Sequence, residues 1–187
     1  MQQAWLQNFG GLKSVPWYWY TDLLLLAFGL ALALSSRERS GLRMGTIRER
    51  WRPVLLVCGG AVLATALVYP LLPTRPWGKA PVTMWLVSPL AQDLVFIGYL
   101  YGRLRRAFPG QVRAPLPVDH ALFITLAFFG LWHLQNVGSL PLAYLLFQLF
   151  YTSGLAIIPA LSRQWTGSVW YAVLCHSAIN FIAWVAS

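Results

Sequence analysis

The sequence predicts an all-α fold, a polytopic membrane helix bundle with about six transmembrane helices. Of its 187 residues, 58% are hydrophobic and only 10% are charged, whereas about a quarter of the residues of a soluble domain are charged. Apolar runs near the roughly 20 residues that a helix needs to cross a bilayer recur along the chain. The ten Trp and eight Tyr residues suit a protein that crosses two lipid–water interfaces.

Six apolar runs account for most of the chain. The first is the leucine-rich WYWYTDLLLLAFGLALAL, and the second is bracketed by Pro53 and Pro73, which favour helix ends there. The third contains SPLAQDLVFIGYL, and the fourth, HALFITLAFFGLWHLQNVG, begins at His120. The fifth and sixth are separated only by the polar segment SRQWT. The predicted spans are 17–34, 54–72, 82–101, 120–138, 141–161 and 167–186.

The segments between the runs predict how the chain lies across the membrane. Eleven of the fourteen Lys and Arg residues lie in the segments 35–53, 102–119 and 162–166. These segments follow the first, third and fifth runs, so they share one side, which the positive-inside rule places in the cytoplasm. We therefore expect a multi-pass protein of the cell membrane with cytoplasmic Arg-rich loops and both termini outside.

Other features of the composition narrow the class further. The short connections predict that residues 1–187 form a single integral membrane domain, with 1–16 lying along the interface. The basic residues form no stripe with interleaved aromatics, so nucleic acid is not an expected partner. Cys58 and Cys175 have no CxxC or Cys/His ligand spacing, which favours two small core hydrophobes. We expect no cofactor and no metal.

One carboxylate lies deep in a predicted span, and other polar groups accompany it. Asp93 is about halfway along the third run, where a charge costs roughly 2.5–3.5 kcal/mol on insertion scales and usually has a partner or a function. His133 lies in the fourth run, and His176 and Asn180 lie one helical turn apart in the sixth. We predict that these four side chains, with Gln92 beside Asp93, converge on one cavity. A hydrogen-bonded tie between helices remains the alternative for a single intramembrane histidine.

Three of these side chains belong to two recognisable motifs. FFGLWH gives Phe129-x-x-x-His133, and HSAIN gives His176-x-x-x-Asn180. In this order on separate spans, the motifs resemble the CPBP family of intramembrane proteases, the CAAX-processing and bacteriocin-processing enzymes also called the Abi family. The resemblance covers about residues 82–186. It implies a membrane-helix core that hydrolyses a peptide bond with water.

The first motif of that family, a Glu-Glu pair followed by xxxR and usually Gly, is altered here. Gln92 and Asp93 stand for the two Glu residues and Ile97 for the Arg, while Gly98 fits. In the family the first Glu, together with a histidine, is thought to activate the attacking water. An amide cannot take a proton, so the resemblance implies either that Asp93 has assumed the role or that hydrolysis has been lost.

The resulting hypothesis is an intramembrane endopeptidase that processes a terminal anchor or sorting signal of a membrane-anchored or exported protein. Asp93, oriented by Gln92, would draw a proton from water together with His133 or His176. Asn180 and one histidine would stabilise the oxyanion. Prenylated CAAX substrates are less expected, because their cleavage faces the cytoplasm.

Three other functions stay open at this point. The first is a catalytically inactive CPBP-like membrane partner or immunity-type protein. The second is a zinc-dependent membrane hydrolase with Asp93, His133 and His176 as ligands and water in the fourth position. The third is a proton-coupled transporter, which also uses intramembrane acids and histidines but commonly shows inverted repeats that are not visible here.

Overall fold

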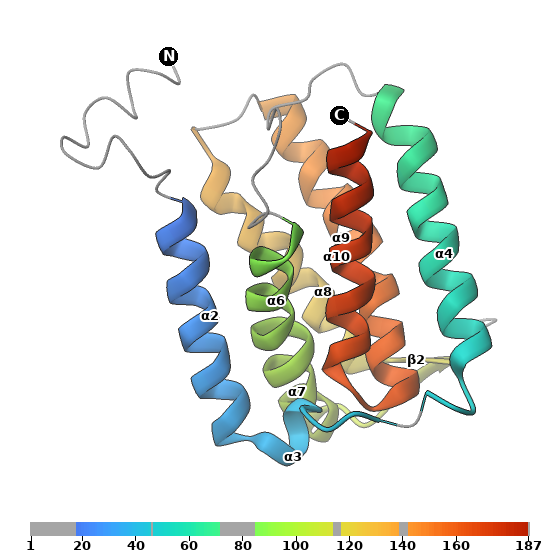
Figure 1. Cartoon of the computed structure of the whole chain (residues 1–187). Coiled ribbons are helices and arrows are strands. Elements are labelled where there is room, and N and C mark those ends of the chain that lie inside the picture. Colours follow the sequence, from blue (N-terminus) through green and yellow to red (C-terminus); the bar gives the residue numbers. More distant parts are fainter. Residues whose placement is uncertain (1–17, 46, 72–84, 114–116, 139–141, 187) are drawn as a thin grey trace.

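The computed structural model describes residues 18–45, 47–71, 85–113, 117–138 and 142–186. Of these residues, 83% are helical, so the all-α prediction is confirmed (Figure 1). The predicted interfacial segment 1–16 lies outside the described residues.

Four of the six predicted spans correspond to long helices. The helices of the first and second predicted spans are separated by the short helix α3 (Arg37–Ser40). This helix ends at Gly41, which lies in the left-handed region with φ of 68°. The helix of the second predicted span continues into a 3₁₀ turn, η1 (Tyr69–Leu71). The long helices are α2 (Tyr18–Ser35), α4 (Trp51–Val68), α9 (Leu142–Thr166) and α10 (Val169–Val185).

The third and fourth predicted spans are not uniform helices. The third consists of α6 (Val87–Asp93), the π-helix η2 (Leu94–Leu100) and α7 (Tyr101–Ala107). The fourth consists of α8 (His120–Trp132) and the 3₁₀ turn η3 (His133–Asn136). Two of these changes of helix type fall at predicted site residues, after Asp93 and at His133, and a third, from η2 to α7, falls at Tyr101. Such π segments inside helices are frequent at functional sites.

A small β-hairpin joins the third and fourth spans, where the sequence predicts only a basic loop. Strand β1 (Gln111–Arg113) pairs antiparallel with β2 (Pro117–Asp119), and Val112 lies opposite Val118. The hairpin leads directly into α8, because Asp119 is the last residue before His120.

The described helices carry an apolar exterior. By length and composition, Trp51–Leu71 and Leu145–Thr166 can cross a membrane, while Tyr20–Ser35 and Val169–Val185 are shorter apolar helices. Six full spans are therefore not confirmed. Large apolar side chains nevertheless point outward, for example Leu56 (75% exposed) and Phe150 (80% exposed). Apolar exposure on this scale marks a surface that meets lipid or a partner.

The chain runs back and forth between the two ends of the bundle (Figure 1). The turns that contain α3, α7 with the hairpin, and the α9–α10 connection lie at one end, at the bottom of the view. These turns coincide with the three Arg-rich segments of the sequence. We call this side of the molecule the Arg-rich end.

The core brings the segments of the predicted site together. Its largest buried cluster joins η2, α7, α8 and α9 and includes Phe96, Ile97, Leu122 and Phe129. Helix α10 packs against α9, α4, α6 and η2, while α2 covers α6 and η2. The third, fourth and sixth predicted spans are therefore joined in one bundle, as convergence of the site residues requires.

The two cysteines, predicted as small core hydrophobes, do belong to one buried cluster, but the sequence did not indicate that they are paired. Cys58 of α4 and Cys175 of α10 form a disulfide, with Cα atoms 5.7 Å apart. The two positions are 117 residues apart in the chain, so no local spacing could have indicated the pairing. The disulfide fixes α4 to the helix that carries His176.

We predict that Gly102→Ala destabilises the Arg-rich end. A Cβ built on Gly102 overlaps the backbone carbonyl of Arg39, so α3 and α7 must move apart. Overpacking of this kind costs about 1–3 kcal/mol, to be measured by equilibrium unfolding in mixed micelles. Gly59→Ala in α4 is the matched control, because its Cβ meets nothing within 4 Å. Equal stability of the two variants would contradict the packing of α3 against α7.

Candidate active site

Asp93 is the last residue of α6 and is fully buried, with 0% of its surface exposed. Its neighbour in the chain, Leu94, begins the π-helix and is also fully buried. The side chain therefore points into the bundle and not toward lipid, as the sequence predicts for a carboxylate at this depth.

The carboxylate of Asp93 is paired with the imidazole of His176 on α10. His176 Nδ1 lies 3.0 Å from Asp93 Oδ1, and 15% of the His176 side chain is exposed. Because Oδ1 of an ionised carboxylate only accepts, Nδ1–H is the donor and Nε2 is left as the acceptor of a neutral ring. A carboxylate that holds an imidazole in this tautomer prepares Nε2 to take a proton from water.

The second oxygen of Asp93 is also important. Oδ2 is buried and makes no hydrogen bond to any residue that the structure describes. A buried polar atom without a partner is costly and usually has an explanation, such as a water or a catalytic role. The carboxylate therefore has one oxygen engaged with His176 and one without a partner among the described residues.

His133 lies where α8 gives way to the 3₁₀ turn η3 and is 8% exposed. Its Nδ1 lies 3.0 Å from the carbonyl oxygen of Phe129, one turn earlier. A carbonyl oxygen only accepts, so Nδ1–H donates and Nε2 is the atom that remains for chemistry. This contact fixes the ring orientation without using any other helix.

Phe129 connects the two histidines. Its ring centroid lies 5.4 Å from that of His133 and 5.9 Å from that of His176. The phenyl ring is 3% exposed and packs edge-on against Phe96 of η2. The spacing Phe129-x-x-x-His133 therefore has a physical meaning: the aromatic residue forms an apolar wall that both imidazoles contact.

The remaining predicted residues take different positions. Asn180 lies one turn after His176 on α10, half-buried, and so shares its face. The amide of Gln92 donates from Nε2 to Ser88 Oγ at 2.9 Å. Among the described residues, no hydrogen bond joins Gln92 to Asp93 or to the histidines. Ile97, at the position of the expected Arg, is 1% exposed and belongs to the largest core cluster.

Two polar groupings were not predicted from the sequence. Ser88, which accepts from Gln92, also interacts with Asp22 of α2. Asp119, the last residue of β2, is 3% exposed and accepts from the hydroxyl of Tyr101 and from Gln111 Nε2 at 2.8 Å. Arg105 Nε lies 3.0 Å from the same carboxylate. In the sequence, the only signal at Asp119 is that an acidic residue directly precedes the fourth predicted span.

The geometry does not favour the zinc alternative. Within the described parts of the chain, no group of three or more His, Cys, Asp or Glu side chains is placed to hold a metal ion. The arrangement instead provides two acceptor nitrogens and a carboxylate oxygen around an apolar wall.

A buried acid–imidazole pair in a bundle of apolar helices is an arrangement suited to a membrane-embedded protease. The family model described as "Type II CAAX prenyl endopeptidase Rce1-like" matches residues 76–182, and the chain belongs to this family. This membership confirms the resemblance to the CPBP membrane proteases. No curated protein matches the chain, and no solved structure matches it.

Proposed function

We propose that the chain is an intramembrane endopeptidase in which the Asp93–His176 pair activates the attacking water. The hydrogen bond between the fully buried carboxylate and the imidazole is the observation that carries this proposal. Membership in a protease family supports the reaction class. The altered first motif is then a replacement: the acid at position 93 supplies the function of the missing Glu.

The proposed reaction begins with a water between Asp93 and His176. Asp93 Oδ2 or His176 Nε2 takes its proton while the water oxygen bonds to the carbonyl carbon of the substrate peptide. The resulting oxyanion collapses, the C–N bond breaks, and the proton passes to the leaving amine. The products are a carboxylate and an amine, and no further reactant is needed.

Two further residues complete the proposed site. The amide of Asn180 can donate to the oxyanion, as can the protonated ring of His176 once it has taken the proton. His133 Nε2 accepts the second hydrogen of the water and holds it in position. Removal of one oxyanion donor typically costs about 10²–10³-fold in rate.

The depth of the pair suggests which substrates reach it. Only the seven residues of η2 separate Asp93 from α7 at the Arg-rich end, whereas His133 follows the thirteen residues of α8 that begin there. If that end is cytoplasmic, as the positive-inside rule predicts, the pair lies near the middle of the bundle, and His133 and Asn180 lie toward the outer side. We therefore propose membrane-anchored or exported proteins, cleaved near a terminal anchor or sorting signal, as substrates.

The direct test is cleavage by the purified full chain in detergent. Peptides that carry an exported terminal anchor and prenylated CAAX peptides are compared by intact mass, in water enriched with heavy oxygen. We expect cleavage of the first group, with one heavy oxygen in the new carboxylate. Preferential cleavage of prenylated peptides would overturn the substrate proposal but not the reaction.

The second candidate is a membrane partner of this fold without hydrolysis. The amide of Gln92 and the apolar side chain of Ile97, both at positions where the family has charged residues, favour it. Across a library of anchored proteins, it predicts no cleavage and a stable complex that co-purifies with the chain. Turnover of any peptide that depends on Asp93 would exclude it.

We predict that peptide cleavage is insensitive to metal removal. The proposed base is a carboxylate–imidazole pair, so dialysis against EDTA or treatment with 1,10-phenanthroline should leave the rate unchanged. The measurement is the initial rate before and after chelation, with metal content determined on the same sample. Loss of activity that returns on addition of zinc would instead support a metal-dependent hydrolase.

A further inference from the structure

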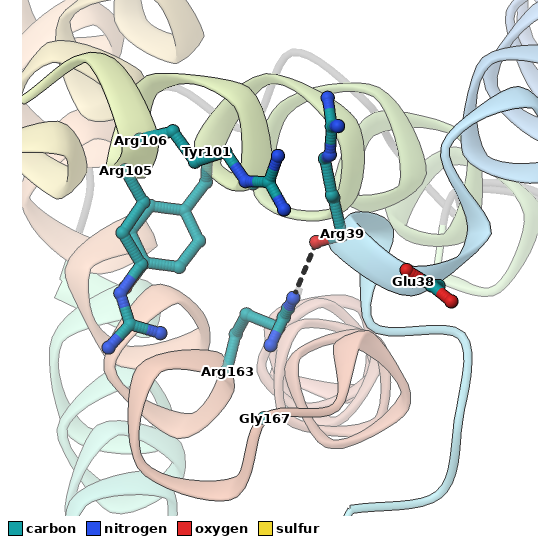
Figure 2. Close-up of a pocket in the computed structure, with 8 residues that line it drawn as sticks. Glu38, Arg39, Tyr101, Arg105, Arg106, Arg163 and Gly167 are labelled. Atoms are coloured by element: carbon teal, nitrogen blue, oxygen red, sulfur yellow. Dashed lines mark hydrogen bonds between the residues drawn. The ribbon is translucent and has the colours of Figure 1, made fainter.

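A pocket of about 290 Å³ opens at the Arg-rich end, away from the Asp93–His176 pair (Figure 2). Residues from α3, from α7 and from the end of α9 with the turn that follows form its walls. Four of its side chains are arginines and one is a glutamate. The lining consists of Glu38, Arg39, Tyr101, Gly102, Arg105, Arg106, Arg163 and Gly167.

Arg163 is the central group of this pocket. It is only 6% exposed, although arginine is rarely buried without a partner. Its Nη2 donates to the carbonyl oxygen of Arg39 at 2.9 Å, and its guanidinium carbon lies 5.9 Å from the ring centroid of Tyr101. Its Nε is buried and has no hydrogen-bond partner among the described residues. The group therefore has an unused donor and an uncompensated charge.

The backbone around Arg163 is shaped to hold it there. Gly41, with φ of 68°, lies so close that a Cβ would overlap the guanidinium group. On the other side, Gly102 of α7 lies directly against the Arg39 carbonyl that accepts from Arg163. A side chain at either position would displace the arginine or its acceptor.

The other charges of the pocket leave it strongly positive. Of its four arginines, only Arg105 pairs with a carboxylate in the described chain, through Asp119. In Figure 2, the guanidinium groups of Arg106 and Arg163 extend toward the middle of the pocket, whereas Glu38 lies at its edge. Glu38 is exposed and forms no ion pair with these arginines among the described residues.

We propose that this pocket binds a phosphate group, in the form carried by an anionic phospholipid headgroup. Guanidinium groups bind phosphate oxygens through paired, charge-assisted hydrogen bonds. The pocket lies at the ends of apolar helices, at the level where headgroups meet a membrane protein, and basic pockets between such helices bind acidic lipids. Inorganic phosphate offers the same chemistry and is the other source of the ligand.

The test uses the purified full chain in a neutral detergent, with phosphatidylglycerol, phosphatidylcholine and inorganic phosphate as probes. Binding is measured by native mass spectrometry and by the rise in Tm. We expect phosphatidylglycerol to bind and stabilise the protein, and Arg106→Gln and Arg163→Gln to weaken it about tenfold, the scale of one charge-assisted hydrogen bond. Arg103→Gln is the matched control, since this exposed arginine of α7 does not line the pocket.

The outcomes separate the sources of the ligand. If inorganic phosphate at millimolar concentration competes with phosphatidylglycerol, the phosphate group alone is sufficient for binding. If inorganic phosphate does not compete, the ligand is the lipid. Equal binding of phosphatidylcholine, or equal weakening by Arg103→Gln and Arg106→Gln, would overturn the proposal in favour of diffuse charge attraction. If Arg163→Gln does not fold, Arg106→Gln and Arg39→Gln decide the result, because both side chains are at least partly exposed.

Discussion

Asp93→Asn is expected to lower the rate of peptide cleavage by about 10²–10⁴-fold, the usual contribution of a general base. Asparagine keeps the size of the side chain, but its amide takes no proton at the pH of the reaction. It also presents no second carboxylate oxygen to a water, which is the role proposed for the unpartnered Oδ2. The effect should appear in kcat, since the lost interaction belongs to the transition state.

The measurement is a single-turnover cleavage rate on the substrate found for the unmodified protein, normalised to the folded fraction. Asp119→Asn is the matched control, because it changes a second buried carboxylate, 3% exposed, in the hairpin next to α8. We expect that variant to lose stability through Tyr101 and Arg105 while its folded fraction keeps its rate. Undiminished turnover by Asp93→Asn would refute Asp93 as the base.

The second large effect concerns stability. Removing the partner of a buried carboxylate leaves its charge without compensation and costs about 3–5 kcal/mol. Asp93 is fully buried, and the only hydrogen bond of its carboxylate to the described chain is the one to His176, at 3.0 Å. We therefore expect His176→Leu to lower the free energy of unfolding by about 3 kcal/mol.

A double-mutant cycle gives this prediction its control. Asp93→Leu combined with His176→Leu removes both members, and apolar replacement of a buried pair is often neutral or stabilising. We expect the double variant to unfold at a higher denaturant concentration than His176→Leu alone, while both are equally inactive. Additive losses in the cycle would show that the two side chains act independently.

The helical class and the contact between Asp93 and an imidazole can both be predicted from the local composition of the apolar runs. Apolar runs and polar interruptions are local properties of composition, so α2, α4, α9 and α10 can be read directly from the chain. Within such runs, a carboxylate has few groups that can compensate it. The expectation that Asp93 meets an imidazole followed from that scarcity, and the hydrogen bond to His176 is its structural counterpart.

The remaining features depend on tertiary contacts that no local pattern contains. Gln92 bonds to Ser88 because that hydroxyl lies one turn earlier on the same helix, a choice among rotamers that the sequence leaves open. The pairing of Cys58 with Cys175 requires α4 to lie against α10. The helix breaks after Asp93 and at His133 likewise leave no signature in residue type, because apolar side chains tolerate π, α and 3₁₀ geometry alike.

The π-helix η2 has a consequence for both polar centres of the third span. A π turn holds one more residue than an α turn, and one residue corresponds to about 100° of rotation around an α-helix. Upstream, Asp93 faces His176; downstream, Tyr101 faces Asp119. The extra residue therefore sets the rotation between Asp93 and Tyr101, so that each side chain faces its own partner. Deleting any one residue of 94–100 would turn one of the two side chains away from its partner.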